Sequence, residues 1–474
     1  MNKSIRITSF FSLLLIVVLL VNLTWIQSFR EDDLAQNPLN GRAFLETKST
    51  PRGQISTGGQ ILAQSHQDDN GFYQREYVTN PEAFAPVQGY LSDIYGAAGL
   101  ESGYNAILNG TDSSLFTSQW LDVLSGKPTQ GANIELTLDP TMQETAYDQL
   151  TQNGYEGAVV ALRPSTGEVL TMASSPSFNP NSIVNSATAA DAWAEYTSDP
   201  QSPLLNHATQ ESLPPGSIFK IITTAAGLDN GYSADSPVTA ASEITLPGTT
   251  TTLTNYAGQA CAGGGTTTLQ TAFALSCNTA FVEMSVDIGA DALRDAAADF
   301  GVGRNYDLGI NNVSGGLGEI PDDAALGQSS IGQRDVEMSV LQAAVMAATV
   351  SNGGVRMEPY LVSRVTGQDL SELSSHEPES DGGIEPEIAE QITELMKASE
   401  RNTSGYTGAD IASKTGTAEH GGEDTPPHTW YVAFQDDVAV AVLVKNGGGF
   451  GTGATGGAVA APIGRAVLQA AGGL

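Results

Sequence analysis

Hydrophobic residues form one long run near the start of the chain, because no charged residue occurs over positions 7–29. A helix rises about 1.5 Å per residue, so this run makes roughly 34 Å of helix, enough for a hydrocarbon core of about 30 Å. Lys3 and Arg6 precede the run, and acidic residues follow it at positions 31–33. Since positive charge stays on the cytoplasmic side of a membrane, residues 1–29 are predicted to be a transmembrane anchor with a cytoplasmic N-terminus and an exported body.

A cleaved signal peptide is the alternative interpretation of this run, because it shares the basic start and the apolar core. A signal peptide usually has a shorter core, followed by an Ala-x-Ala-like cleavage site. Residues 22–28 contain no such site. The sequence therefore favours a single-pass protein of the cell membrane that keeps its anchor.

Beyond the anchor, short alternating or apolar runs predict strands, and longer alanine-rich runs predict helices. Residues 30–65 are polar and rich in turn-forming residues, and the pattern over 66–130 does not indicate a fold. The remaining predictions are strands at 134–138, 157–162, 168–173, 430–434 and 438–444, and helices at 142–150, 341–350 and 388–399. Strands at both ends of a helical middle indicate an α+β domain over residues 155–474, preceded by a smaller N-terminal domain over 30–154.

The composition fits a globular protein and argues against nucleic acid as a partner. The chain has 20 basic and 53 acidic residues, which give a formal net charge of −33. A nucleic-acid surface needs clustered Lys and Arg to neutralise phosphates, and here these residues are few and scattered. The hydrophobic content of 40% is ordinary for folded domains and too high for a mainly disordered chain.

A serine and a lysine lie three positions apart where a helix is predicted to begin, at Ser217 and Lys220 after the Pro-Pro-Gly of residues 214–216. Residues at this spacing share one face of a helix. A serine hydroxyl is a weak nucleophile until a base removes its proton, and a lysine can serve only if burial or a nearby cation lowers its pKa. The alternative is an N-cap serine beside a surface lysine.

Two further polar motifs follow along the chain. Ser276 and Asn278 are two positions apart in a segment, 268–284, that is predicted to be helical. Lys414 begins the last motif, which continues as Thr415, Gly416 and Thr417. A side chain at the glycine would block the close approach of a ligand to this predicted strand. Ser-x-x-Lys, Ser-x-Asn and Lys-Thr-Gly in this order are the signature of penicillin-binding proteins and β-lactamases.

The sequence resembles the class B penicillin-binding proteins, the membrane-anchored D,D-transpeptidases of peptidoglycan synthesis, over nearly its whole length. Besides the three motifs, the resemblance rests on residues 52–55, 99–104, 157–176, 330–333, 352–354 and 414–419. It implies the fold of the penicillin-binding proteins and serine β-lactamases, which is an antiparallel sheet flanked by helices. A smaller dimerisation or linker domain would precede this domain in the chain. The connection at 420–424, which the family varies freely, leaves the substrate preference open.

The resemblance also implies the catalytic roles. Ser217 would be acylated by the penultimate D-Ala of a stem pentapeptide, and Lys220 would take its proton. Ser276 and Lys414 would relay a proton to the leaving amine. An amine of a neighbouring stem would then resolve the ester and leave a cross-link, and β-lactams would inhibit the enzyme through the same serine.

The binding roles follow from the same resemblance. Asn278 would bind the donor peptide, and Thr415 and Thr417 would bind its carboxylate on the strand that holds Gly416. Backbone N–H groups of Ser217 and Thr417 would form the oxyanion hole. A membrane-embedded glycosyltransferase is the expected protein partner, and no cofactor is expected.

Other proteins share the acylation step and differ in what accepts the acyl group. A β-lactamase needs neither an anchor nor a long N-terminal segment, and the Glu-x-x-Leu-Asn stretch of one lactamase class does not occur here. A D,D-carboxypeptidase, or a β-lactam-sensing or scaffold protein that acylates without cross-linking, is the alternative to the transpeptidase. The sequence does not distinguish a role in cell division from one in elongation and cell shape.

Two other kinds of site have weaker support. Residues 451–456 fit the G-x-G-x-x-G pattern between a predicted strand and a predicted helix. A dinucleotide site also needs a second parallel strand and an acidic residue about 20 positions further on, and the sequence stops at Leu474. The histidines show no spacing of a metal site, so no metal is expected.

Cys261 and Cys277 are the two cysteines, and both belong to the predicted exported part. Thiols oxidise outside the membrane, so a disulfide between them is expected, with two free buried thiols as the alternative. The bond would pin the glycine-rich loop at 258–265 to the segment that carries Ser276 and Asn278.

Overall fold

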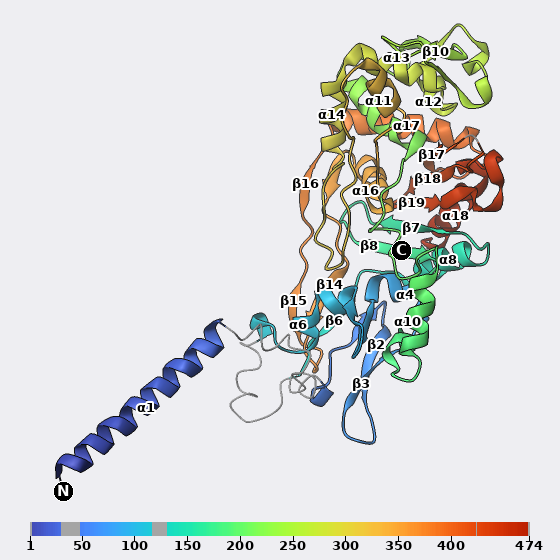
Figure 1. The fold of residues 1–474 in the computed structure, drawn as a ribbon. Coiled ribbons are helices and arrows are strands. Elements are labelled where there is room, and N and C mark those ends of the chain that lie inside the picture. Colours follow the sequence, from blue (N-terminus) through green and yellow to red (C-terminus); the bar gives the residue numbers. More distant parts are fainter. Residues whose placement is uncertain (1, 30–47, 116–129, 423, 473–474) are drawn as a thin grey trace.

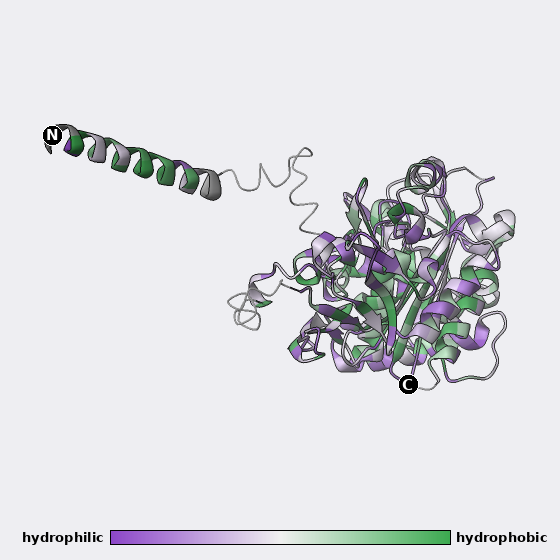
Figure 2. Cartoon of the chain, turned by 90° about the horizontal axis from the view of Figure 1, so that it is seen from below, coloured by the Kyte–Doolittle hydropathy of each residue, from purple (hydrophilic) through white to green (hydrophobic). Residues whose placement is uncertain are grey.

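The computed structural model describes residues 2–29, 48–115, 130–422 and 424–472. Helix α1 (Asn2–Phe29) contains a segment, Ile5–Trp25, that is long and apolar enough to cross a membrane. None of this segment is buried against the rest of the protein, and Figure 2 shows its mostly hydrophobic colouring. The structure thus has the kind of helix that the sequence predicts for an anchor. The turn-rich segment predicted to follow lies outside the described residues as far as residue 47.

A six-stranded sheet organises the N-terminal part of the body, in the order β15-β14-β6-β1-β2-β3. Strand β6 runs parallel to β1 and antiparallel to β14. A hairpin from late in the chain therefore completes a sheet that begins near residue 55, and the two parts of the body share it (Figure 1). The strands are β1 (Ile55–Thr57), β2 (Gln60–Gln67), β3 (Tyr73–Tyr77), β6 (Asn133–Leu136), β14 (Val362–Thr366) and β15 (Glu372–Ser375).

A buried ion cluster holds this N-terminal part together. The carboxylate of Glu101 is fully buried and accepts hydrogen bonds from Arg52 Nε at 2.6 Å and from Arg75 Nε at 2.5 Å. Tyr77 donates its hydroxyl to the same carboxylate at 3.2 Å. Burial by itself raises the pKa of Glu101, but the two guanidinium groups hold it below its usual value. Two of the segments that carry the family resemblance thus meet in one compensated cluster.

The larger part of the body is built around a five-stranded antiparallel sheet, in the order β17-β18-β19-β7-β8. Every residue of β7, β8 and β19 is buried, which requires cover on both faces. Strand β17 lies at one edge of the sheet. The strands are β7 (Gly157–Leu162), β8 (Val169–Ser175), β17 (Ala412–Ala418), β18 (His428–Gln435) and β19 (Val438–Val444).

Helices cover the two faces of this sheet (Figure 1). Helices α8 (Pro140–Thr151) and α18 (Gly456–Ala470) share one apolar core with one face of the strands. Helix α16 (Val340–Ser351), which is buried along nearly its whole length, packs on the other face. Helix α17 (Pro386–Asn402) packs against the edge strand β17, and α11 (Lys220–Asp229) packs against α17. This arrangement confirms the predicted α+β fold with an antiparallel sheet flanked by helices.

The remaining elements lie around these two sheets. Between 73 and 115 they include α4 (Pro81–Gln88), β4 (Tyr90–Ser92), β5 (Gly96–Ala98), α5 (Leu100–Gly103) and α6 (Asn105–Leu108), in the region where the sequence pattern does not indicate a fold. Later elements are α9 (Pro180–Val184), α10 (Ala189–Ser198), β9 (Pro237–Thr239), β10 (Glu243–Thr245), β11 (Thr252–Thr254), β12 (Thr266–Thr268), α12 (Leu269–Ala274), α13 (Asn278–Ile288), α14 (Ala290–Asp299), α15 (Asp323–Ser329), β13 (Val355–Met357) and β16 (Ser380–Gly383).

The predicted helix over 268–284 is wrong as a continuous element. Helix α12 ends at Ala274, and α13 begins only at Asn278. Ser276, between the two helices, has φ 60, a left-handed value that breaks an α-helix. The other predicted strands and helices are present with their ends shifted by a few residues.

Candidate active site

Ser217 lies in a short 3-10 helix, Gly216–Phe219, that leads directly into α11. Gly216 has φ 55, a left-handed conformation that favours glycine, and its N–H donates to Gly332 O at 2.9 Å. The sequence predicts a helix that begins at Ser217, and the structure has a 3-10 turn there, with the α-helix beginning at Lys220. The turn places the half-buried serine at the wall of a cavity.

The amine of Lys220 is held by the Ser-x-Asn segment. Its Nζ donates to Ser276 O at 2.8 Å and to Asn278 Oδ1 at 2.7 Å, and it lies 3.2 Å from Ser276 Oγ. Among the residues that the structure describes, no hydrogen bond joins Lys220 to Ser217. Ser217 nevertheless lines the same cavity as Ser276 and Asn278.

Lys414 reaches the same hydroxyl from the edge of the sheet. Its Nζ donates to Ser276 Oγ at 2.9 Å and to Thr415 O at 3.1 Å. Ser276 Oγ therefore lies between two lysines, one from α11 and one from β17. The three sequence motifs meet at this hydroxyl.

Burial lowers the pKa of both lysines. Lys220 is 0% exposed and Lys414 is 1% exposed. The pKa of Lys220 lies well below its usual 10.5, first because of burial and second because Lys414 is a neighbouring cation. Burial lowers the pKa of Lys414 to about 7. A lysine with a lowered pKa can supply the neutral amine that a general base requires.

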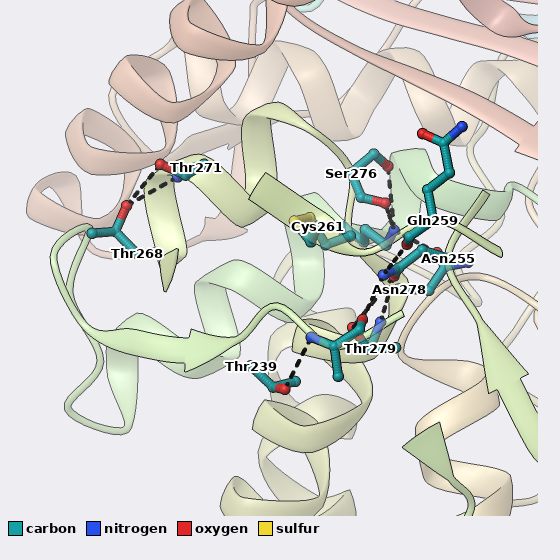
Figure 3. The surroundings of a disulfide bond; sticks show 12 residues. Thr239, Asn255, Gln259, Cys261, Thr268, Thr271, Ser276, Asn278 and Thr279 are labelled. Atoms are coloured by element: carbon teal, nitrogen blue, oxygen red, sulfur yellow. Dashed lines mark hydrogen bonds between the residues drawn. A yellow bond between two sulfur atoms is a disulfide. The ribbon is translucent and has the colours of Figure 1, made fainter. Parts of the chain in front are cut away.

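Loops and the disulfide support the break that carries Ser276 and Asn278 (Figure 3). Cys277 is bonded to Cys261, with the two Cα atoms 5.8 Å apart, and both side chains are buried. The side-chain amide of Asn278 donates to Thr254 O at 3.0 Å. The covalent bond and this hydrogen bond tie the end of β11 and the loop after it to the break between α12 and α13.

Residues of the edge strand β17 alternate between the cleft and the interior. Thr415 and Thr417 line the cleft, whereas Lys414 and Gly416 are buried. A Cβ at Gly416 would lie 2.8 Å from Pro215 O, so the glycine lets the strand pack against the turn that precedes the serine. This close packing gives the glycine a role within the protein, beside the close approach of a ligand that the sequence indicates.

The cleft has a volume of about 770 Å³. The residues predicted for the site that line it are Ser217, Ser276, Asn278, Thr415 and Thr417. Lys220 and Lys414 are buried and contact the cleft through Ser276 Oγ. The structure therefore brings all the predicted motif residues to one place.

Two aromatic rings lie next to the buried lysines, and no sequence motif predicts them. Lys220 Nζ lies 5.3 Å from the centre of the Phe281 ring, and Lys414 Nζ lies 5.7 Å from that of Phe273. These distances are within the range of cation–π contacts, which favour the charged form slightly. The rings also exclude water, and this desolvation acts in the opposite direction. Both residues fit the pattern of ordinary core positions, so the sequence does not distinguish them.

A second cluster behind β17 also has no motif. The buried carboxylate of Glu400 accepts hydrogen bonds from Ser413, from Tyr431 Oη at 3.0 Å and from Arg465 Nε at 2.8 Å. Ser413 precedes Lys414 on β17, so the cluster fixes the strand next to the Lys-Thr-Gly motif. The four side chains come from four separate elements, which explains why no local pattern shows them.

The structure gives the glycine run at 451–456 a packing role. Its last glycine, Gly456, begins α18, and a Cβ there would lie 2.3 Å from Trp430 O and 2.6 Å from Gly416 O. Within the described parts of the chain, no group of three or more His, Cys, Asp or Glu side chains is placed to hold a metal ion.

Comparison with known proteins agrees with this geometry. The family model described as "Penicillin binding protein transpeptidase domain" matches residues 157–469, and that of the "Penicillin binding protein A dimerisation domain" matches 52–134. The chain is 46% identical to the peptidoglycan D,D-transpeptidase PbpA of Mycolicibacterium smegmatis and 45% identical to that of Mycobacterium tuberculosis, covering 99% of each chain in both cases. The resemblance of the sequence motifs to actinobacterial penicillin-binding protein A agrees with the name PbpA that both relatives carry.

Solved structures show the same relationship. The penicillin G acyl-enzyme complex of penicillin-binding protein A from M. tuberculosis is 45% identical, with a TM-score of 0.85 over 89% of this chain and 100% of that one. The D,D-transpeptidase domain of a peptidoglycan glycosyltransferase from Eggerthella lenta is 27% identical, with a TM-score of 0.75 over 90% of this chain and 100% of that one. Since the transpeptidase model spans most of the sequence and the relatives match from end to end, this chain belongs to the class B penicillin-binding proteins.

Proposed function

We propose that this protein is a membrane-anchored peptidoglycan D,D-transpeptidase that β-lactams inhibit. Ser217 Oγ attacks the carbonyl of the penultimate D-Ala of a stem pentapeptide, and the bond to the terminal D-Ala breaks. An amine of a neighbouring stem then attacks the resulting ester, which frees Ser217 and leaves a cross-link. The relatives named as D,D-transpeptidases and the acyl-enzyme structure of one of them support this reaction.

The observation that carries the proposal is the Ser276 hydroxyl held between two buried lysines. Lys220, with its lowered pKa, takes the proton of Ser217. Ser276 and Lys414 relay a proton to the leaving D-Ala amine through their 2.9 Å hydrogen bond. A catalytic hydrogen bond that is absent from an unliganded enzyme does not exclude Lys220 as the base of Ser217, because such bonds often tighten only in the complex with substrate.

The binding roles use the residues that line the cleft. Asn278 binds the donor peptide, and Thr415 and Thr417 bind its terminal carboxylate. Backbone N–H groups of Ser217 and Thr417 stabilise the oxyanion of the tetrahedral intermediate. Gly416 keeps β17 close to the serine turn, so that the two N–H groups converge.

Covalent labelling tests the nucleophile. Fluorescent penicillin should label the wild-type protein, and mass spectrometry should locate the adduct on the Ser217 peptide. The Ser217→Ala variant should lose the label and keep its melting temperature, because a half-buried hydroxyl contributes little to stability. Labelling that persists in this variant would remove Ser217 as the nucleophile.

Turnover on stem peptides tests the class of reaction. A transpeptidase joins the donor to an added acceptor amine, a carboxypeptidase gives only the hydrolysed tetrapeptide, and a sensor or scaffold stops at the acyl-enzyme. A cross-linked product that depends on Ser217 supports the proposal, and hydrolysis alone in the presence of acceptor contradicts it.

The proposal includes the placement of the protein in the cell. Lys3 and Arg6 lie on the cytoplasmic side of α1, and the body after the anchor is exported. Residues 30–154 form the N-terminal domain and 155–474 the transpeptidase domain, a division that the two family matches support. A membrane-embedded glycosyltransferase supplies the glycan strands. Protection of the body from protease in intact cells, rather than cleavage, would contradict the orientation.

A further inference from the structure

Two charged side chains line the cleft, Arg334 and Glu419. The guanidinium of Arg334 is engaged, because its Nη1 donates to Glu319 O and lies 2.9 Å from Asp335 Oδ2. The side chain of Glu419 is exposed, and in the described part of the chain its carboxylate has no hydrogen bond and no ion pair. A negative charge without a protein partner therefore lies at the cleft.

Glu419 lies on the cleft side of the chain, one residue beyond the end of β17. Thr415, Thr417 and Glu419 are alternate residues, and all three line the cleft. Glu419 comes two residues after Thr417, so its Cα lies at most about 7 Å beyond that of Thr417 along the chain. Since β17 is an edge strand, its free edge can pair with an extended peptide.

The direction of the donor peptide follows from the proposed function, on which this inference rests. The terminal carboxylate lies at Thr415 and Thr417, and the scissile carbonyl lies at the N–H groups of Ser217 and Thr417. The rest of the donor must then run antiparallel to β17, toward Glu419. The residue before the acylated D-Ala lies about 3.5 Å further along the donor, in the direction of Glu419. Its extended side chain covers the remaining distance to the Glu419 carboxylate.

We infer that Glu419 selects donor stems whose residue before the two terminal D-Ala residues carries a free side-chain amine. A stem that is cross-linked through a side-chain amine brings the same group when it serves as donor. The ammonium of that side chain then pairs with the carboxylate of Glu419. An ion pair that remains open to water changes a rate by up to about fivefold, which sets the size of the expected preference.

Two synthetic donors test this inference on the full-length protein in detergent. Both end in D-Ala-D-Ala and differ only in the side chain of the preceding residue, whose amine is free in one and acetylated in the other. The readout is the ratio of the two acylation rates, kcat/KM, within each variant, and penicillin labelling counts the active protein. Wild type should favour the free amine by about fivefold, and Glu419→Gln should reduce the ratio to about one.

Asp424→Asn is the matched control, because Asp424 is an exposed carboxylate on the same β17–β18 connection and does not line the cleft. This control should keep the wild-type ratio. A ratio near one in the wild type, or a full preference in Glu419→Gln, would overturn the inference.

A third result would assign the carboxylate to the acceptor. If Glu419→Gln kept the donor ratio and instead lowered transfer to an added amine relative to hydrolysis, Glu419 would serve the acceptor and the inference would be overturned. Failure of the wild type to be acylated by either donor or by penicillin would refute the proposed function itself. The two failures are therefore distinguishable.

Discussion

Glu101 in the N-terminal part and Lys220 in the transpeptidase domain are both fully buried, but their surroundings differ. The carboxylate of Glu101 is paired with two guanidinium groups, Arg52 and Arg75. Lys220 has a second lysine, Lys414, as its charged neighbour, and its hydrogen bonds go to neutral oxygens. Burial opposes charge in both clusters. Around Glu101, the opposite charge of the two guanidinium groups outweighs the effect of burial on the pKa. Around Lys220, the like charge of Lys414 adds to the effect of burial.

The comparison separates structural charge from catalytic charge. A compensated buried charge remains ionised and fixes the geometry of its partners, but it has no proton to exchange near neutral pH. An uncompensated lysine pair lowers the stability of the fold, and in return it presents an amine that can take a proton from a serine. Removing a charge from the lysine cluster should therefore abolish activity and leave the stability of the fold nearly unchanged. Removing the charge of Glu101 from the ion cluster should lower the stability of the fold and leave activity nearly unchanged.

The largest expected effect is on acylation in variants of Lys220. Lys220→Arg should slow acylation by penicillin about 10³-fold, because a guanidinium does not release its proton to become a base. Lys220→Met should be as slow, with a melting temperature equal to or above that of the wild type, since no charge is then buried. Stopped-flow acylation and thermal unfolding measure the two quantities.

A surface lysine provides the control for these variants. Lys397 is partly exposed and pairs with Glu394 and Asp410, so Lys397→Arg should change neither acylation nor melting temperature. An active Lys220→Arg enzyme would count decisively against the assignment of the base.

The opposite half of the comparison is tested at Glu101. Glu101→Gln leaves two buried guanidinium groups without their counter-charge, and such a loss typically costs about 3–5 kcal/mol of unfolding free energy. The acylation rate per folded molecule should stay within about twofold of the wild type, because Glu101 belongs to the N-terminal part. Denaturant unfolding, followed by penicillin labelling of the folded fraction, measures both.

Glu76→Gln is the control in the same sheet, because this carboxylate is exposed and lies 3.7 Å from His66 Nδ1. It should change stability by less than about 0.5 kcal/mol. Equal stability of the Glu101 and Glu76 variants would show that the buried cluster is not what holds the N-terminal part together.

The sequence predicts which residues meet at the candidate site better than it predicts their surroundings. Ser217, Lys220, Lys414 and the Ser-x-Asn pair belong to short motifs whose spacing is visible in one chain. The break at Ser276 is not visible in the hydrophobic pattern, because apolar residues at helical spacing continue on both sides of it, in α12 and in α13.

Long-range pairing explains the other part that the sequence does not predict. Strand β14 joins β6 across more than two hundred residues, and the ligands of Glu400 come from separate elements. Periodicity reports which face of an element is buried and not which distant element covers it. The ion cluster around Glu101 has the same character: Arg52 and Glu101 lie in segments that carry the family resemblance, but Arg75 lies in neither.

The next effect in size concerns the support of the lysine pair. Replacing Cys261 and Cys277 together by serine removes a bond that closes a loop with a sequence separation of 16. The chain-entropy model gives about 3 kcal/mol for a loop of this size, so the melting temperature should fall. Acylation should slow as well, because Ser276, which contacts both lysines, is next to Cys277.

Thiol titration of the exported wild-type protein completes this test. Denatured without reductant, it should show no free thiol, and after reduction it should show the behaviour of the double-serine variant. Two titratable thiols before reduction would mean that the bond does not form in the exported protein.

The smallest expected effect is on stability between pH 7 and pH 8. The pKa of Lys414 is about 7 in the folded protein and returns to its usual 10.5 when the chain unfolds. Between these values the unfolded state binds more protons than the folded state, so the free energy of unfolding rises with pH, by about 1 kcal/mol from pH 7 to pH 8. The contribution of Glu101, whose folded pKa lies below 4.5, is complete above that pH and is lost only as the pH falls through the folded value. Denaturant unfolding at both pH values should therefore show the rise in the wild type and in Glu101→Gln, and Lys414→Met should lack it. Acylation by the wild type should increase over the same interval as the lysine pair loses a proton. A Lys414→Met variant with the pH dependence of the wild type would show that this lysine is not held near neutrality, and the contrast between the two buried clusters would no longer explain the catalytic site.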